Sequence, residues 1–155
     1  MSMSTTGPAD RRDALEIATE CLGSRVRYLD RLLARIYDGA LREHGVTAAQ
    51  LSMLVAIALA GPTTPAWVGR RLELEKSTVS RNLARLRAAG LVTADGGGLR
   101  VTPRGAALIR AAHPAWRRAQ RQARLALGPQ SLRLLSAVDP MARRQTKQRK
   151  QEETS

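Results

Sequence analysis

The residue types that read DNA are concentrated in one short stretch of the chain: Ser77, Thr78, Arg81, Asn82 and Arg85. An arginine can donate two hydrogen bonds to a guanine, an asparagine can pair with an adenine, and hydroxyls can reach bases or phosphates. No acidic residue occurs between Lys76 and Ala94 to repel a phosphate backbone. This combination indicates a surface that contacts nucleic acid.

The same stretch has the spacing of a helix with one buried edge. Its apolar residues recur at steps of four and three: Val79, Leu83 and Leu86. On a helix they share one side, and Thr78, Arg81 and Arg85 lie on the opposite side. Ser77 is of the type that caps helix N-termini, so we expect a helix from a Ser77 cap to about Ala88. A solvated surface helix whose arginines contact only water would show the same pattern.

The segments on either side complete a helix-turn-helix with a wing. Thr64 and Pro65 have the types of a helix cap and a first helical residue, so a short helix precedes the Ser77 helix. Thr47 and Gln50 have the spacing of a capping box for the helix before that one. The runs 91–93 and 99–101 flank a glycine-rich turn and predict a small β-hairpin. We therefore expect a winged helix-turn-helix over residues 46–104.

Long helices are expected on both sides of this lobe. Apolar residues recur at steps of three and four through residues 10–45, which predicts one helix from Asp10 to Glu43, with Gly45 as its stop. Such a helix spans about 50 Å, longer than the small domain that the rest can form, so one end should pack on a second copy. Further helices are expected over 105–139, broken at Gly128, and the basic tail 140–155 is expected to be disordered.

The predicted fold class is therefore mainly α with a small β-hairpin wing: a winged helix-turn-helix flanked by N- and C-terminal dimerisation helices. The chain has 155 residues, 26 Lys and Arg, 13 Asp and Glu and a net charge of +13. A charge so far from zero favours a polyanionic partner. There is one cysteine, no signal-peptide core and no membrane-length apolar run. We expect a cytoplasmic, nucleoid-associated protein with no membrane partner.

The chain resembles the MarR family of bacterial regulators, over about residues 10–139. The matching residues are Ile36-Tyr37, His44-Gly45-Val46-Thr47, Gln50-Leu51, Ser77-Thr78-Val79-Ser80-Arg81, Leu86, Gly90-Leu91-Val92 and Val101-Thr102-Pro103-Arg104-Gly105. The resemblance implies a triangular homodimer that binds a pseudo-palindromic operator in double-stranded DNA. It also implies a repressor released by a small aromatic or phenolic ligand, or by an oxidant.

The wing departs from the family pattern. It is several residues shorter, and its tip, residues 95–98, carries no arginine. Contact between the wing and the minor groove is therefore in question, and Arg100 and Arg104 are expected to contact backbone phosphates instead. A short wing also places more of the base recognition on the Ser77 helix.

Effector and redox sites have several candidates. Tyr37, His44 and Trp67 are candidate ligand-binding residues, with Trp116 as a further aromatic. Cys21 is either an oxidant-sensing thiol or a small residue buried at the dimer interface. His44 and His113 are the only histidines, too few for the four ligands of a zinc site, so no metal is expected.

A run of arginines follows the wing: Arg110, Arg117, Arg118, Arg121 and Arg124. They either pair with acids of the first helix across the dimer, such as Glu16, Glu20 or Asp30, or bind an anionic effector. No glycine-rich phosphate or oxyanion loop accompanies a nucleophile, so neither catalysis nor a cofactor is expected. A nucleoid-type protein that coats DNA without an effector is the remaining alternative.

Overall fold

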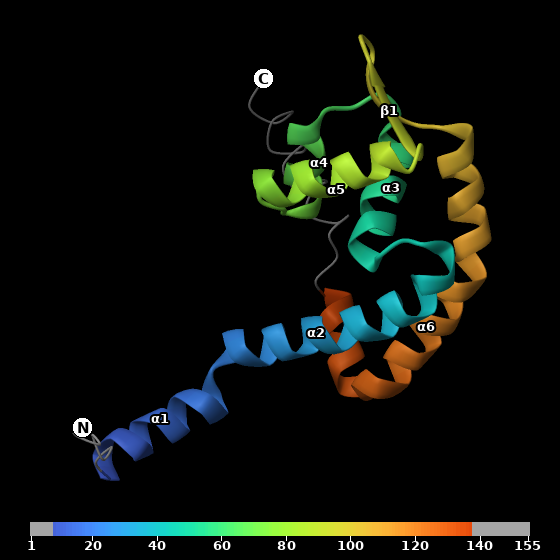
Figure 1. Ribbon diagram of the computed structural model, residues 1–155. Helices are drawn as coiled ribbons and strands as arrows, with labels where there is room; N and C mark the ends of the chain where they lie inside the picture. Colours follow the sequence, from blue (N-terminus) through green and yellow to red (C-terminus); the bar gives the residue numbers. More distant parts are fainter. Residues whose placement is uncertain (1–7, 138–155) are drawn as a thin grey trace, which may run out of the picture.

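The computed structural model describes residues 8–137, so the expected basic tail at 140–155 lies outside the described residues. The elements follow in the order α1 (Pro8–Glu20), α2 (Leu22–Leu41), η1 (Arg42–His44), α3 (Ala48–Ala60), α4 (Pro65–Leu72), α5 (Lys76–Ala88), β1 (Val92–Asp95), β2 (Gly98–Val101) and α6 (Pro103–Ala137). Helices α3, α4 and α5 form a lobe with the hairpin at its tip, while α2 and α6 cross beside it (Figure 1). The predicted fold class, mainly helical with a two-stranded wing, is confirmed.

The N-terminal segment forms two helices, and the prediction of one helix from Asp10 to Glu43 is wrong. Cys21 separates them, because its backbone is extended at φ −65° and ψ 105°. Gly23 and Ser24 lie in the first turn of α2, and a Gly/Ser pair is a common cause of a sharp helix break. As a result α1 projects away from the rest of the molecule (Figure 1). Gly45 ends the segment as expected, in the left-handed conformation at φ 70°.

Helices α3 and α4 begin at the caps that the sequence predicted. The Thr47 hydroxyl accepts a hydrogen bond from the Gln50 N–H at 3.2 Å, and the Thr47 N–H donates to the Gln50 side chain at 3.0 Å. The Thr64 hydroxyl accepts from the Trp67 N–H at 3.1 Å, with Pro65 as the first helical residue. These caps satisfy N–H groups that have no partner inside their helices, and so they fix where each helix starts.

The core is built around α3 from aliphatic side chains, since the chain has no phenylalanine. The largest fully buried side chains are Leu41, Met53, Leu54, Ile57, Val68, Leu86 and Leu99. Where α2 crosses α6, small residues on α6 are buried instead: Ala112, Ala115, Ala119 and Ala123. Such small side chains let two helix backbones approach closely, which fixes the position of α6 beside the lobe.

The hairpin is attached to the lobe at its base. Val92 pairs with Val101 and Asp95 with Gly98, and Thr63 adds a bridge to Leu99. A Cβ atom at Gly98 would lie 2.7 Å from the Thr63 carbonyl oxygen, so only glycine fits there. Helix α6 then starts at a Thr102 cap, whose hydroxyl accepts from the Gly105 N–H at 3.0 Å.

Helix α6 is divided at Gly128, as the sequence predicted. Gly128 has φ 70° and ψ 167°, which no helix allows, and Pro129 follows it. Among the described residues no single helix is long and apolar enough to cross a membrane. Residues Leu22–His44 and Ala48–Ala60 reach that length and apolarity only as a pair, bent by 74°.

Candidate nucleic-acid interface

Helix α5 is anchored by the apolar edge that the sequence predicted. Val79, Leu83 and Leu86 are buried, at 2%, 3% and 1% exposure. They pack with Val68 of α4 and Leu54 of α3 in the main core cluster. The opposite side of α5 therefore lies at the surface of the molecule. Packing of the buried edge in the core sets the orientation of this exposed side.

The start of α5 differs from the prediction. The helix begins at Lys76, and Glu75 rather than Ser77 occupies the N-cap position, without a side-chain cap bond. The turn is set upstream: Glu73 has a left-handed backbone at φ 53°, and the Leu74 N–H donates to the Gly69 carbonyl at 2.9 Å. The Ser77 cap prediction is therefore wrong, and Ser77 lies inside the first turn of α5, where it is exposed.

The predicted contact residues of α5 occupy neighbouring faces of the helix. Arg81 and Arg85 are exposed one turn apart, whereas Thr78 and Asn82 are half-buried. The Arg81 guanidinium lies 3.4 Å from the Thr78 hydroxyl, and the Asn82 amide donates to the Thr78 carbonyl at 3.0 Å. Arg81 and Arg85 are thus accessible on the outer side of α5, and Asn82 is held against its own helix.

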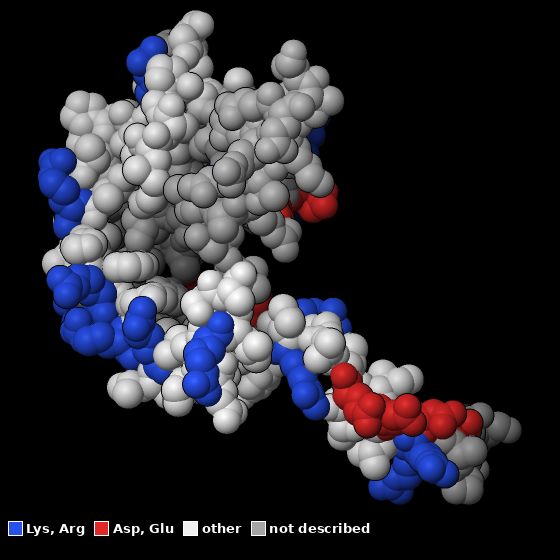
Figure 2. Space-filling view, turned by 180° about the vertical axis from the view of Figure 1, so that it is seen from behind, with Lys and Arg blue, Asp and Glu red and all other residues white. Residues whose placement is uncertain are grey.

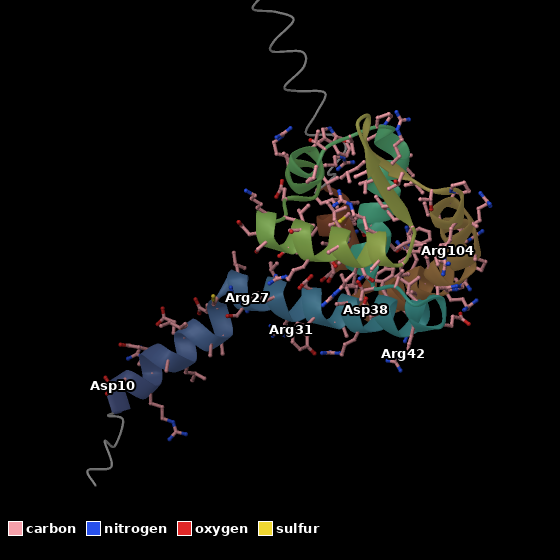
Figure 3. The ribbon with its side chains drawn as sticks, turned by 45° about the horizontal axis from the view of Figure 1, so that its top comes forward. Asp10, Arg27, Arg31, Asp38, Arg42 and Arg104 are labelled. Atoms are coloured by element: carbon pink, nitrogen blue, oxygen red, sulfur yellow. The ribbon has the colours of Figure 1, made fainter. Side chains whose placement is uncertain are left out.

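Arg100 and Arg104 lie at the other end of α5. Arg100 is exposed on β2, opposite Thr93. Arg104 is in the first turn of α6, and its Cδ atom lies 3.8 Å from the position of a Cβ at Gly90, just after α5 (Figure 3). The structure therefore places both near the C-terminal end of α5, away from Ser77. The tip between β1 and β2 is formed by Gly96 and Gly97, which have no side chain to enter a groove.

A basic groove beside α5 was missed by the sequence reasoning. It lies between α4 and α5, has a volume of about 670 Å³, and three cations line it: Arg70, Lys76 and Arg87. Lys76 and Arg87 are 11 residues apart, which is close to three turns, and so they share one side of α5. That periodicity was the available signal, but Lys76 was placed outside the predicted helix.

A second hollow lies between α2, α3 and α6. Its volume is about 510 Å³, and its lining is mainly apolar: Tyr37, Leu41, Ala48, Leu51, Ser52, Val55, Ile109, His113 and Trp116. The rings of His113 and Trp116 stack, with centroids 5.9 Å apart. Aromatic and aliphatic walls with a few polar groups are typical of sites for small organic ligands.

Tyr37 closes this cavity on one side. Its hydroxyl donates a hydrogen bond to the Gln120 side chain, which joins α2 to α6. Burial raises the pKa of the Tyr37 phenol, and the nearby Arg124 opposes that shift. The phenol is therefore neutral at physiological pH and acts as a hydrogen-bond donor.

Of the three expected ligand-binding residues, only Tyr37 lines the cavity. His44 lies in η1, with Nε2 3.7 Å from Glu43 Oε1. Trp67 packs from α4 against the core. The cavity instead receives His113 and Trp116 from α6, because the α2–α6 crossing brings distant segments together. That crossing could not be derived from local sequence periodicity.

Cys21 occupies the N-cap position of α2 and is half-exposed. Hydrogen bonds from the side chain and N–H of Ser24 lower the pKa of its thiol, and the Gly23 N–H and Arg27 act in the same direction. A thiolate at a helix N-terminus is also favoured by the helix dipole. The break between α1 and α2 thus creates the environment of a reactive cysteine.

Comparisons with known proteins agree with this geometry. A family model described as MarR family matches residues 44–100. The transcriptional regulator MosR of Mycobacterium tuberculosis is 30% identical, with 88% of this chain and 97% of that chain covered and a TM-score of 0.66. Its structure in complex with DNA gives 31% identity, 81% and 98% coverage and a TM-score of 0.67.

A probable transcriptional regulator from Pseudomonas aeruginosa is 25% identical, with 80% and 96% coverage and a TM-score of 0.67. No curated protein matches the chain in sequence. Both of these similar proteins are described as transcriptional regulators. The anchored α5, the two-stranded wing and these similarities together show that the chain belongs to the MarR family of DNA-binding transcriptional regulators.

Proposed function

We propose that the chain is a homodimeric repressor that binds a pseudo-palindromic operator through α5 and is released by a small aromatic or phenolic ligand. The observation that carries the proposal is α5 itself, with a buried edge and with Arg81 and Arg85 exposed on the other side. In a dimer, two such helices would enter successive major grooves, with half-site centres about one helical turn apart. The complex of MosR with DNA supports this use of the fold.

The homodimer is supported by apolar side chains that one copy leaves in water. They are Leu15, Ile17, Leu22, Val26 and Tyr28 on α1 and α2, and Leu125, Leu134 and Leu135 near the end of α6. Clusters of exposed apolar residues mark interaction surfaces. Residues 10–45 and 105–139 would accordingly hold the subunits together, and 46–104 would hold the DNA. A protein of this kind would act in the cytoplasm, at the nucleoid.

The effector would bind in the cavity between α2, α3 and α6. The volume of about 510 Å³ suits a small organic molecule. Trp116 and His113 offer stacking surfaces for an aromatic ring, and Tyr37 offers a phenol. Because α2 and α6 belong to the proposed dimerisation part and α3 to the lobe, a ligand there would alter the spacing of the two α5 helices.

The test is binding to the DNA that flanks the protein's own gene, by footprinting, with and without aromatic acids, phenols and peroxide. A regulator should prefer one site over scrambled duplex by at least about a thousandfold. A uniform coat on all duplexes would instead indicate a nucleoid-type protein. Protection that no compound relieves would remove the effector part of the proposal.

Arg81→Ala tests the reading helix directly. If Arg81 contacts a base, the variant should lose about 1–3 kcal/mol of operator affinity for each half-site and discriminate less at one base pair in each half-site. Arg31→Ala, which removes the same charge from α2, is the matched control and should leave base preference unchanged. Equal losses on operator and scrambled DNA would show that Arg81 contacts only phosphate.

Oxidant sensing through Cys21 is the second candidate function. The specific observation in its favour is the lowered pKa of the thiol at the N-cap of α2. Oxidation there would add bulk at the break between α1 and α2. Relief of the footprint by peroxide in the wild type, but not in Cys21→Ser, would favour this mode of release over the aromatic ligand.

A further inference from the structure

Two exposed faces of opposite charge lie on helices far apart in the sequence. The acidic face of α1 consists of Asp13, Glu16 and Glu20, and the arginine stripe of α6 consists of Arg117, Arg121 and Arg124. All six side chains are exposed. Figure 2 shows the acids as a line along the projecting α1 and the basic residues gathered over α6. Among the described residues, Arg118 of the same helix pairs with Glu43 at 3.0 Å, within its own chain.

The two faces match in spacing when the helices run antiparallel. Along α1 the acids are separated by three and then four residues. Along α6, read from its C-terminal side, Arg124, Arg121 and Arg117 are also separated by three and then four. At 1.5 Å per residue both faces span about 10 Å. The pairs in register are Asp13 with Arg124, Glu16 with Arg121, and Glu20 with Arg117.

Exposed apolar residues lie beside both faces. Ile17 of α1 is 67% exposed, and Leu125 of α6 is 85% exposed. Charge pairs at a protein surface are individually weak, so a stable contact needs apolar burial beside them. The two helices offer both kinds of contact together.

The same chain does not bring these faces together. Figures 1 and 2 both show α1 extending away from α6, beyond the break at Cys21. Helix α6 packs on α2, α3, η1 and β2 of its own chain, and its arginine stripe faces outward. A second copy carries the acidic face that the stripe lacks.

We propose that the acidic face of α1 docks antiparallel on the arginine stripe of α6 in a second copy of this chain. The proposal rests on the homodimer proposed above and assigns it a specific contact, made twice by symmetry. The two faces contribute more to partner choice than to affinity, because two acidic faces or two arginine stripes would repel each other, whereas a shifted alignment only leaves some charges unpaired. The acidic face of α1 would thus favour pairing with a second copy of the same chain.

Charge reversal tests the docking. The first variant is Asp13→Lys, Glu16→Lys and Glu20→Lys; the second is Arg117→Glu, Arg121→Glu and Arg124→Glu. Each alone should raise the dimer Kd in sedimentation velocity at low salt by about tenfold or more, because it places like charges at both contacts. An equimolar mixture should restore wild-type affinity, since each reversed α1 then meets a reversed stripe. That recovery also shows that both variants are folded.

A single reversal provides the matched control. Arg121→Glu lies in the register and should weaken the dimer, whereas Arg110→Glu lies on the same helix outside it and should change the Kd by less than about twofold. If the wild type is a dimer and neither triple reversal changes its Kd, the docking proposal is overturned and the homodimer stands. The dimer Kd could also recover in a chain that carries both triple reversals but not in the mixture of the two variants. That result would mean that α1 contacts α6 of its own chain, and it would overturn the docking proposal. A wild type that stays monomeric would overturn the homodimer itself.

Discussion

Cys21 shows how the chemistry of one residue depends on where the helix breaks. Its N–H donates to the Ile17 carbonyl and its carbonyl accepts from the Ser24 N–H, so the backbone bonds continue across the break. The sulfur lies at the start of α2, 3.8 Å from the position of a Cβ at Gly23. At the N-cap of α2, the Ser24 and Gly23 N–H groups and the Ser24 hydroxyl stabilise the thiolate. The lone cysteine was visible in the sequence, but the break that activates it was not.

The prediction that follows concerns the pH dependence of Cys21 alkylation. A lowered pKa means that more of the thiol is ionised at neutral pH, so the rate with iodoacetamide should level off at a lower pH than for free cysteine. Ser24→Ala removes the largest stabilising contact and should move the midpoint of the rate profile upward. A wild-type midpoint at or above that of free cysteine would contradict the assignment.

At the scale of elements, the junction of α5, the wing and α6 depends on Gly105. A Cβ atom there would lie 2.2 Å from the Leu91 carbonyl oxygen and 2.8 Å from Val101 Cγ1. Backbone cannot yield as a flexible side chain would. Gly105→Ala should therefore lower the free energy of unfolding by about 1–3 kcal/mol or more, as overpacking does. The measurement is urea unfolding followed by circular dichroism.

Gly96→Ala is the control for that measurement. Gly96 lies in the hairpin turn, and nothing lies within 4 Å of a Cβ built there. The free energy of unfolding of Gly96→Ala should stay within about 0.5 kcal/mol of the wild-type value. Equal effects of the two substitutions would show that general loss of glycine flexibility, and not the contact with Leu91, decides stability.

How far the elements follow from the sequence depends on how local their determinants are. The caps at Thr47 and Thr64 and the buried edge of α5 were predictable, because each depends on residues within two turns. The start of α5 was not, since the left-handed Glu73 and the Leu74–Gly69 bond set it from outside the helix. The break at Cys21 was missed because steps of three and four fit two helices as well as one.

The functional residues divide in the same way. Arg81 and Arg85 follow from the periodicity of a single helix, so their exposure was predictable. The cavity was not, because Tyr37 and His113 meet only through the crossing of α2 and α6. For the same reason, local periodicity does not indicate that His113 lines the cavity while His44 and Trp67 lie outside its lining. Local sequence patterns determine a helix face, but only packing determines which faces share a cavity.

At the scale of the whole molecule, the net charge of +13 is unevenly distributed. Helix α5 and the groove beside it carry cations without acids, while α1 carries a line of acids at the far end. DNA binding and subunit pairing would therefore both weaken with salt, for different reasons. DNA binding weakens through counterion release, and pairing weakens through screening of exposed charges.

This distribution predicts the salt dependence of operator binding, which must be measured well above the dimer Kd so that pairing does not contribute. If two subunits neutralise roughly six phosphates, affinity should fall about a thousandfold between 50 and 200 mM salt. Arg100→Ala and Arg104→Ala should each reduce the slope of log K against log salt by about two units, one for each subunit, equally on operator and scrambled DNA, if they contact phosphates. Fluorescence anisotropy with labelled duplex gives both slopes. An unchanged slope in both variants would mean that the shortened wing and the start of α6 do not touch the DNA, and that α5 with its flanking Arg70, Lys76 and Arg87 provides the electrostatic contact alone.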